Sequence, residues 1–256
     1  EEGVQEVSNG SFSQEGSELV TNGSFDTDND WTKQTGWSIS GGTANCDGTQ
    51  TANSLIYQSG VFASADSFKC EITISNYQSG VLRFVLGGGG SEQSYSANGT
   101  YTFYGTKGSD NNLYLSANSD FIGSIDNVSV REVAQNWTLS PTFTIAENKL
   151  RCVSDGSYQY ANQNCMVVGK TYKITFDITD WVSGNVRVRP SGQSPFQSAG
   201  SNGSYVFYYT NVLSSTLTIE RNGIPTDLSI TNISVKEVGQ NWNLNGVDFS
   251  LGSVFF

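Results

Sequence analysis

The sequence predicts an all-β protein made of two tandem jelly-roll β-sandwich domains with the start of a third repeat. The prediction rests on composition, on an internal repeat and on short stretches that alternate with period two. Only 14% of the 256 residues are charged and 12% are aromatic, while Gly, Ser, Asn and Thr abound. Disordered chains carry more charge and fewer aromatic residues, and β-branched and aromatic side chains favour strands over helices.

The internal repeat is the strongest of the three signals. The segment Ile125–Trp137 returns as Ile230–Trp242 with nine of thirteen positions identical. Asn98–Phe103 returns as Asn202–Phe207 in the same order along the chain. Each repeat therefore runs from one tryptophan to the next, a little over a hundred residues, and Trp242 begins a third copy.

Inside each repeat the side chains alternate as they do in half-buried strands. Leu82, Phe84 and Leu86 alternate with other residues in the first repeat, and Val186 and Val188 do so in the second. Asn-Gly, Ser-Gly and Gly-Gly turns separate these stretches at nearly regular spacing. About eight short strands in a hundred residues are typical of a jelly roll.

These signals divide the chain into four parts. Near the N-terminus, Val7-Ser-Asn-Gly-Ser-Phe12 foreshadows Val20-Thr-Asn-Gly-Ser-Phe25, which suggests that repeats extend further. The expected parts are an N-terminal linker or end of a preceding repeat (1–17), a first sandwich repeat (18–135), a second one (136–240), and the start of a third repeat or a C-terminal strand (241–256).

Charge and composition exclude several classes of function. A net charge of −11 argues against nucleic acid and against an anionic membrane surface, and no apolar run is long enough for a membrane span. Without histidine there is no His-based triad or His-ligated metal. Since no pair of carboxylates recurs at matched spacing, we expect no enzyme. The four cysteines suggest free buried thiols, with a Cys46–Cys70 or Cys152–Cys165 bond left open.

Three motifs of the first repeat resemble a known superfamily. Glu18-Leu-Val-Thr-Asn-Gly-Ser-Phe-Asp26, Gly36-Trp37 and Ile125-Asp-Asn-Val-Ser-Val130 resemble the carbohydrate-binding modules of families 4, 9 and 22. The repeats also look like tandem units of tailed-bacteriophage structural proteins, where Ile-Asp-Asn-Val-Ser-Val-Lys-Glu precedes Gln-Asn-Trp. The resemblance implies a jelly roll with a glycan cleft on one sheet.

The resemblance also implies a structural calcium ion between the opening and closing segments of a module. Asp26 and Asp126 would be its carboxylate ligands in the first repeat, since calcium prefers several hard oxygens. Asp26 stands where the family usually has Glu. In the second repeat Thr231 replaces Asp126, and the Asn-Gly-Ser-Phe-Asp opening is missing, so calcium is expected in the first repeat only.

Aromatic rings match the apolar face of a pyranose, and bidentate polar side chains match its hydroxyls. Three pairs that recur in both repeats fit these roles and are the predicted glycan-binding residues: Gln58, Tyr77 and Arg83 in the first, and Gln163, Trp181 and Arg187 in the second. The alternative is that Tyr77 and Trp181 cover the end of the core. Trp31 and Trp137 recur at the repeat boundaries and are expected to pack one repeat against the next.

Together these features indicate a non-enzymatic glycan-binding segment of a bacteriophage virion appendage, such as a tail or head fibre or a decoration protein. Weak binding to polysaccharide or cell-surface glycan would gain avidity from many copies. The expected location is the virion surface, with other virion proteins as partners and a homo-oligomer left open. The alternatives are a purely structural spacer, and an accessory carbohydrate-binding or adhesin region of a secreted or cell-surface bacterial protein.

Overall fold

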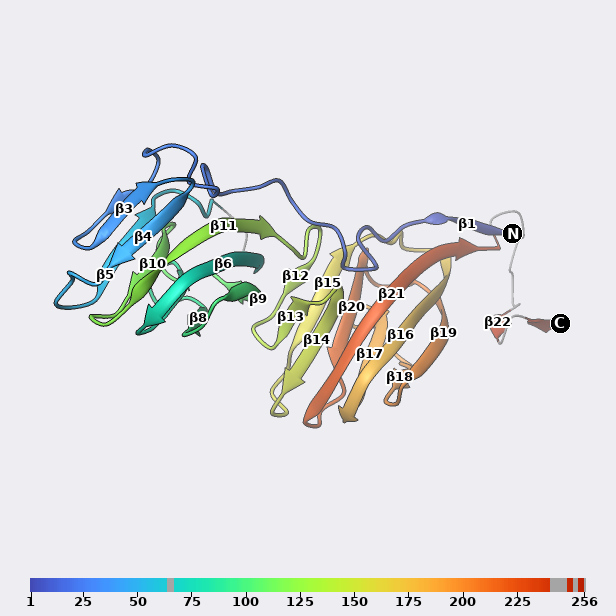
Figure 1. Cartoon of the computed structure of the whole chain (residues 1–256). Helices are drawn as coiled ribbons and strands as arrows, with labels where there is room; N and C mark the ends of the chain where they lie inside the picture. Colours follow the sequence, from blue (N-terminus) through green and yellow to red (C-terminus); the bar gives the residue numbers. More distant parts are fainter. Residues whose placement is uncertain (64–66, 240–247, 251–252, 256) are drawn as a thin grey trace. The chain divides into compact units, whose positions relative to one another are not determined.

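All regular structure in the described part of the chain is β-strand, as the composition predicts. The computed structural model describes residues 1–63, 67–239, 248–250 and 253–255 (Figure 1). These residues form no helix, and so none that could cross a membrane. The start of the third repeat predicted at Trp242 lies outside the described residues, although β22 (Asp248–Ser250) and β23 (Ser253–Phe255) pair as a small hairpin beyond it.

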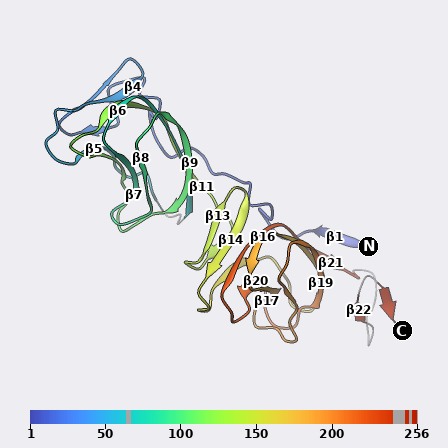
Figure 2. The ribbon, with the colours of Figure 1, turned by 60° about the horizontal axis from the view of Figure 1, so that its bottom comes forward.

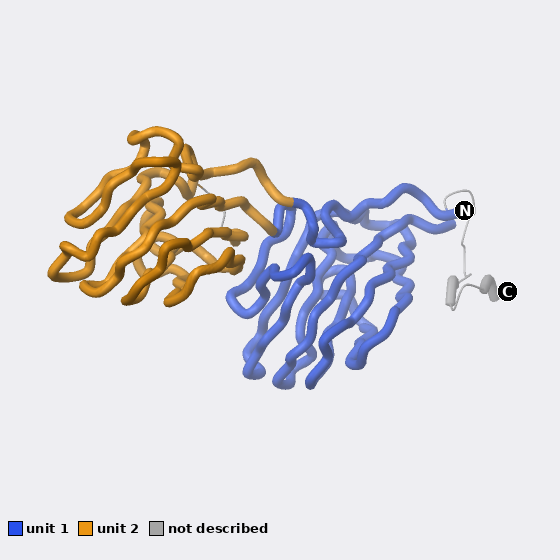
Figure 3. Tube along the Cα trace, in the orientation of Figure 1, with its two compact units in different colours: residues 1–14, 134–256 blue, residues 15–133 orange. Residues whose placement is uncertain are grey.

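The chain divides into two units, unit 1 (1–14 and 134–256) and unit 2 (15–133) (Figure 3). Unit 2 consists of two five-stranded antiparallel sheets. In spatial order the first sheet is β2 (Thr32–Lys33), β5 (Ser54–Gln58), β10 (Leu113–Ala117), β7 (Leu82–Leu86) and β8 (Glu92–Tyr95). The second is β3 (Trp37–Ser40), β4 (Thr43–Asp47), β11 (Ile122–Glu132), β6 (Ser67–Ser79) and β9 (Gly99–Thr106).

Unit 1 repeats this order strand for strand. Figure 2 shows strands of both units from a second direction. Its first sheet is β12 (Thr138–Leu139), β15 (Tyr160–Asn164), β20 (Thr216–Arg221), β17 (Val186–Pro190) and β18 (Ser198–Ala199). Its second sheet is β13 (Phe143–Ala146), β14 (Lys149–Ser154), β21 (Thr226–Val238), β16 (Thr171–Ser183) and β19 (Gly203–Thr210), with β1 (Glu2–Gln5) added along β21. The matched order confirms the predicted tandem of antiparallel sandwiches.

Alternation along the strands builds the core of each unit. On β7 of unit 2, Leu82, Phe84 and Leu86 are fully buried, whereas Arg83 and Val85 lie on the opposite face. Val186 and Val188 are buried in the same way on β17. Because successive side chains of a strand point to opposite faces, one face of each first sheet packs on the core and the other faces away from it, although β20 is buried on both faces.

The division into units differs from the expected one at the N-terminus. Residues 1–14, expected to be a linker or the end of a preceding repeat, belong to the same unit as residues 134–256. The second repeat was expected to have no Asn-Gly-Ser-Phe opening. Its opening is the segment Val7–Phe12, which lies before the first repeat in the sequence. Unit 2 is inserted between the opening of unit 1 and the rest of it. Sequence order alone hides this, because the opening and its strands are not contiguous.

We call residues 2–12 and 15–25 the opening segments of unit 1 and unit 2. Each contains the turn Asn-Gly-Ser-Phe, in which Phe25 N–H donates to Asn22 O over 3.2 Å, as Phe12 N–H does to Asn9 O. Glycine is required in the turn, because a Cβ on Gly23 would lie 2.0 Å from the backbone oxygen of Val128. A Cβ on Gly10 would likewise lie 2.0 Å from Ile233 O.

The motifs Ile125-Asp-Asn-Val128 and Ile230-Thr-Asn-Ile233 form the strand irregularity that receives each turn. Asn127 on β11 and Asn232 on β21 have φ of 51° and 53°, a backbone conformation that Asn tolerates better than most residues. The register of β11 against β6 shifts between Asp126 and Ser129, as in a β-bulge. Within the bulge, Val128 N–H donates to Gly23 O over 2.9 Å.

The recurrent tryptophans Trp31 and Trp137, predicted to pack one repeat against the next, each pack against the opening segment of their own unit. The Trp31 and Phe25 rings lie 5.1 Å apart, and Trp31 Nε1–H donates to Asn22 O. In unit 1 the Trp137 and Phe12 rings lie 5.3 Å apart, and Trp137 Nε1–H donates to Asn9 O. Each tryptophan is therefore part of the core of its own unit.

The four cysteines are unbonded, and three of them, Cys46, Cys70 and Cys152, are buried. Burial raises the pKa of the Cys152 thiol to about 11. A thiol with so high a pKa is almost entirely protonated at neutral pH and is a poor nucleophile. These cysteines act as small apolar core residues.

Candidate functional site

The solvent face of the first sheet in each unit gathers the side chains best suited to bind a ligand. We call these surfaces the unit 1 face and the unit 2 face. The unit 1 face lies on β15, β20, β17 and β18, and the unit 2 face lies on β5, β10, β7 and β8. Both belong to antiparallel sheets whose other side is the core, so side chains on the face are free to differ without disturbing the packing.

A carboxylate held by two arginines forms the centre of the unit 1 face. Glu220 on β20 is buried, and Arg189 Nη2 and Nε donate to its Oε1 over 2.6 and 3.1 Å. Arg187 Nη1 lies 3.5 Å from the same oxygen. The three residues come from neighbouring strands, because Arg187 on β17 is the register partner of Glu220. A buried carboxylate needs such pairing to remain charged.

Aromatic rings stand around this cluster. The Arg187 guanidinium carbon lies 3.9 Å from the centroid of the Phe196 ring, which is 42% exposed. Tyr158, which is 62% exposed, donates its hydroxyl hydrogen to Glu220 Oε2 over 3.1 Å and packs on Tyr160. Partial burial and, to a lesser extent, the nearby charge of Glu220 raise the pKa of the Tyr158 hydroxyl, so the hydroxyl stays a donor at neutral pH.

Two polar atoms near the middle of this face lack a partner. Thr218 on β20 is only 1% exposed, and its Oγ1 has no hydrogen-bond partner among the described residues. The same holds for Oδ1 of Asn162, the register partner of Thr218 on β15. Buried polar atoms are normally satisfied, in many proteins by an ordered water molecule, so this buried pair is a place where a water molecule would fit.

The unit 2 face has different chemistry at the same register positions. Tyr57 and Tyr114 stand where unit 1 has Asn162 and Thr218, and their rings lie 5.8 Å apart. Arg83 corresponds to Arg187 but bonds to exposed Glu92 over 3.3 Å. This face offers an aromatic pair with an exposed ion pair beside it, which suits stacking more than a dense hydrogen-bond network.

Of the predicted glycan-binding residues, Arg83 and Arg187 lie on the two faces, but Tyr77 and Trp181 do not. Tyr77 lies near the end of β6 and Trp181 near the end of β16, both in the second sheets. Tyr77 packs against Phe121 of the core and donates its hydroxyl hydrogen to Gly80 O. Trp181, 40% exposed, donates Nε1–H to Gly184 O. The alternative role, covering a core end, fits Tyr77 better than Trp181.

Gln58 and Gln163 face inward and fasten the opening segments. Gln58 Oε1 accepts from Thr21 N–H over 2.9 Å, and its Nε2 donates to Thr21 O over 2.8 Å. Gln163 forms the same two bonds with the backbone of Ser8, over 2.7 and 2.9 Å. Both side chains are buried, and these bonds occupy the amide groups that were expected to meet sugar hydroxyls.

The predicted calcium ligands Asp26 and Asp126 each accept a hydrogen bond from a neighbouring residue. Asp26 Oδ2 accepts from Ser24 Oγ over 2.7 Å, and Asp126 Oδ1 accepts from Asn127 N–H over 2.6 Å. No group of three or more acidic, cysteine or histidine side chains that could hold a metal occurs among the described residues. Calcium also takes backbone carbonyl oxygens, and calcium in the first repeat stays a prediction.

Sequence reasoning missed Glu220, Arg189 and Phe196. Arg189 follows Arg187 at the spacing of two that places both on one face of a strand, which is a usable signal. Glu220 ends an alternating stretch and could have been matched to these arginines only with the order β20–β17 in hand. Phe196 follows β17 in a loop and has no periodic pattern to mark it.

Comparisons with known proteins concern the fold. No protein-family model matches the sequence, and a search of curated proteins finds no match. The N-terminal CBM22 tandem domain from Paenibacillus barcinonensis Xyn10C matches with a TM-score of 0.34 and 12% identity, over 88% of this chain and 99% of that one. A structure of allantoicase matches at 0.30 and 10%, over 86% and 89%. A Paenibacillus xanthan lyase matches at 0.24 and 14%, over 83% and 25%. At these values the likenesses carry no argument about function.

Proposed function

We propose that the chain is a non-enzymatic glycan-binding segment that uses its two sheet faces as binding sites. The observation that carries the proposal is the unit 1 face, where the Arg187–Glu220–Arg189 cluster lies beside the unpartnered Thr218 Oγ1 and Asn162 Oδ1. Sugar hydroxyls donate and accept at short spacing, and charged groups fixed in place bind them without reorganising.

The rings around the cluster supply the other half of sugar recognition. Phe196 and Tyr158 are large, exposed and next to the polar centre. Exposed aromatic rings of this kind cover the C–H face of a pyranose. On the unit 2 face Tyr57 and Tyr114 would stack a sugar ring, and Arg83 with Glu92 would bind its hydroxyls.

Hydrolysis is not part of the proposal, for a geometric reason. Both oxygens of Glu220 are engaged, one by the arginines and the other by the Tyr158 hydroxyl. A carboxylate so tied is a poor general acid, and glycoside hydrolysis needs two carboxylates across the bond that breaks. The cluster therefore suits binding.

We further propose that the segment belongs to a bacteriophage virion appendage and lies on the virion surface, next to other virion proteins. The tandem units support this setting, because weak sites gain avidity when many copies act together. The net charge of −11 argues against a nucleic-acid ligand. An accessory or adhesin region of a secreted bacterial protein would use the same faces.

A structural spacer is the second candidate function. The observation that favours it is the exposed Arg83–Glu92 pair, which is ordinary for a protein surface and points to no ligand. Under this alternative the chain sets length only, and neither face binds a sugar.

A glycan array probed with the full chain separates the two. We expect a weak signal that falls about 10-fold, or about 1.4 kcal/mol, in Phe196→Ala and Asn162→Ala. Trp181→Ala is the matched control, because Trp181 is exposed but lies on the other sheet. A blank array, or a signal that Phe196→Ala, Asn162→Ala, Tyr57→Ala and Tyr114→Ala all leave unchanged, would reject the proposed sites and favour the spacer.

A further inference from the structure

The opening segment of unit 1 reaches the rest of its unit only by way of unit 2. Residues 1–14 precede unit 2 in the chain, and residues 134–256 follow it. The opening segment of unit 2 is joined to its own strands directly. In unit 1, therefore, the opening segment packs as a separate strand against residues that come later in the chain. We call the surface of β21 and Trp137 that holds it the unit 1 groove, and the matching surface of unit 2 the unit 2 groove.

The groove holds this segment through contacts that need no covalent link. Gln5 Oε1 accepts from Val235 N–H over 2.9 Å, and its Nε2 donates to Ile233 O. Further along, Gly10 O accepts from Ile233 N–H over 2.9 Å. The Phe12 ring is buried against Trp137. A strand bound through its backbone and anchored by one aromatic ring is the mode in which protein domains add a peptide strand.

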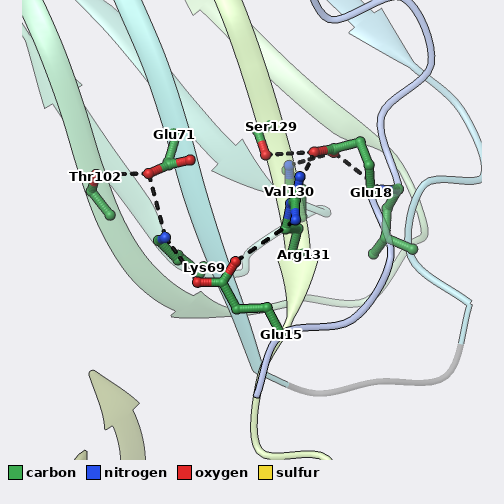
Figure 4. Close-up of polar contacts among 9 residues, drawn as sticks. Glu15, Glu18, Lys69, Glu71, Thr102, Ser129, Val130 and Arg131 are labelled. Atoms are coloured by element: carbon green, nitrogen blue, oxygen red, sulfur yellow. Dashed lines mark hydrogen bonds and ion pairs between the residues drawn. The ribbon is translucent and has the colours of Figure 1, made fainter. Parts of the chain in front are cut away.

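The two opening segments align thirteen positions apart, with seven of eleven residues identical. Glu2, Gln5 and Val7 correspond to Glu15, Glu18 and Val20, and the Asn-Gly-Ser-Phe turns follow in both. Equivalent contacts hold them: Lys173 and Lys236 bind Glu2, as Lys69 and Arg131 bind Glu15 (Figure 4). The groove therefore recognises a sequence that the chain itself carries twice.

One difference between the two segments lies at Gln5 of unit 1 and the equivalent Glu18 of unit 2. In unit 2, Glu18 accepts from Val130 N–H over 2.8 Å and from Ser129 Oγ, and lies 3.4 Å from Arg131 (Figure 4). Gln5 would lose this charge pairing in the unit 2 groove. During synthesis, residues 1–14 therefore have no groove to bind until residues 134–238 have been made.

We propose that the unit 1 groove is a peptide-binding site for the extended sequence Gln-x-Val-Ser-Asn-Gly-Ser-Phe, and that a second copy of this chain supplies it. Exchange of residues 1–14 between two copies then links them. Within one chain the segment stays tethered near its site, so the exchange takes place when chains fold together at high concentration.

A labelled peptide of residues 1–14 tests the site on the full chain. In the Gly10→Ala chain the added methyl collides with Ile233 O, so its own segment fits poorly and the groove is open to the peptide. We expect that chain to bind the peptide at least 10-fold more tightly than the unaltered chain by fluorescence anisotropy. A peptide carrying the same Gly10→Ala change, and the matched Gly23→Ala chain, should show no such gain.

The proposal would be overturned by a folded Gly10→Ala chain that does not bind the peptide. It would also be overturned if that chain bound the unaltered and the Gly10→Ala peptides equally well. If that chain does not fold, unaltered chains with two different tags are unfolded and refolded together at high concentration. Capture by one tag should bring down the other, and excess peptide should lower the yield. Refolded chains that never pair, or pairs that the peptide leaves untouched, also overturn it.

Discussion

Unit 1 and unit 2 share their inner contacts and differ in their outer ones. Gln58 and Gln163 hold backbone in the same way, and the Phe–Trp pairs have nearly the same separations. On the solvent faces, however, Tyr57 and Tyr114 of unit 2 occupy the positions that Asn162 and Thr218 occupy in unit 1. Packing fixes the inner positions, because a small volume change there is destabilising, whereas the faces can acquire different ligands on one framework.

The largest expected effect comes from the phenylalanines of the opening segments. Phe25→Ala should destabilise unit 2 and Phe12→Ala unit 1, each by about 3–5 kcal/mol, because a buried ring is replaced by a cavity. Hydrogen-exchange mass spectrometry would show which amides lose protection. Loss of protection in 31–133 on mutating Phe12, with 137–238 unaffected, would contradict the assignment of openings to units.

The faces should differ almost as strongly in what their acidic residues contribute. Glu220→Gln leaves Arg189 partly buried without its carboxylate, which should cost about 3 kcal/mol. The matched Glu92→Gln removes only an exposed ion pair and should change the free energy of unfolding by less than about 1 kcal/mol. Urea unfolding of both variants measures this. Equal changes in the free energy of unfolding would mean that the Arg187–Glu220–Arg189 cluster stabilises unit 1 no more than an ordinary surface ion pair does.

The glutamines that hold the opening segments should have smaller, and similar, effects. Gln58→Ala and Gln163→Ala each remove two backbone partners and leave buried amide groups unsatisfied, at a cost of about 1–3 kcal/mol. Thermal unfolding of the two variants should show matched losses. A Gln163→Ala chain as stable as the unaltered one would mean that the other contacts hold the unit 1 segment without Gln163.

How far the sequence could predict these features depends on the range of the contacts. Alternation along a strand is local, so Leu82, Phe84 and Arg83 were placed on the correct faces. The partnership of Val7–Phe12 with Trp137 spans the whole of unit 2, and no local pattern reports it. Gln58 was taken for a ligand contact because a polar residue that recurs in both repeats looks functional, although a buried amide that binds backbone recurs for the same reason.

The same limit applies to the unit 1 face. Arg187 was found because it recurs as Arg83, but Glu220 has Ser116 as its counterpart and therefore carried no repeat signal. The comparison of repeats finds what the units share. It cannot find residues by which one unit differs from the other, and those are the residues that give each face its own chemistry.

The smallest effect expected is a difference in acid sensitivity between the openings. Burial alone would raise the pKa of Glu18, but bonds from Ser129, Val130 and Val20 and the charge of Arg131 lower it overall, below the ordinary 4.5. Stabilisation by Glu18 is therefore present above about pH 4.5 and lost as pH falls through its lowered pKa. Gln5 holds the same place in unit 1 and does not titrate.

Glu18→Gln should thus flatten the pH dependence of unit 2 between about pH 3 and 5, with a change below about 1 kcal/mol because Glu18 is partly exposed. The exposed Glu2, whose pKa is lowered by hydrogen bonds from Lys173 and Lys236, leaves unit 1 a weak dependence of its own. The matched Gln5→Glu change should increase it. Melting temperatures of all three chains measured across this range decide the point, because a Glu18→Gln chain that remains as acid-sensitive as the unaltered one would place the titrating group elsewhere in unit 2.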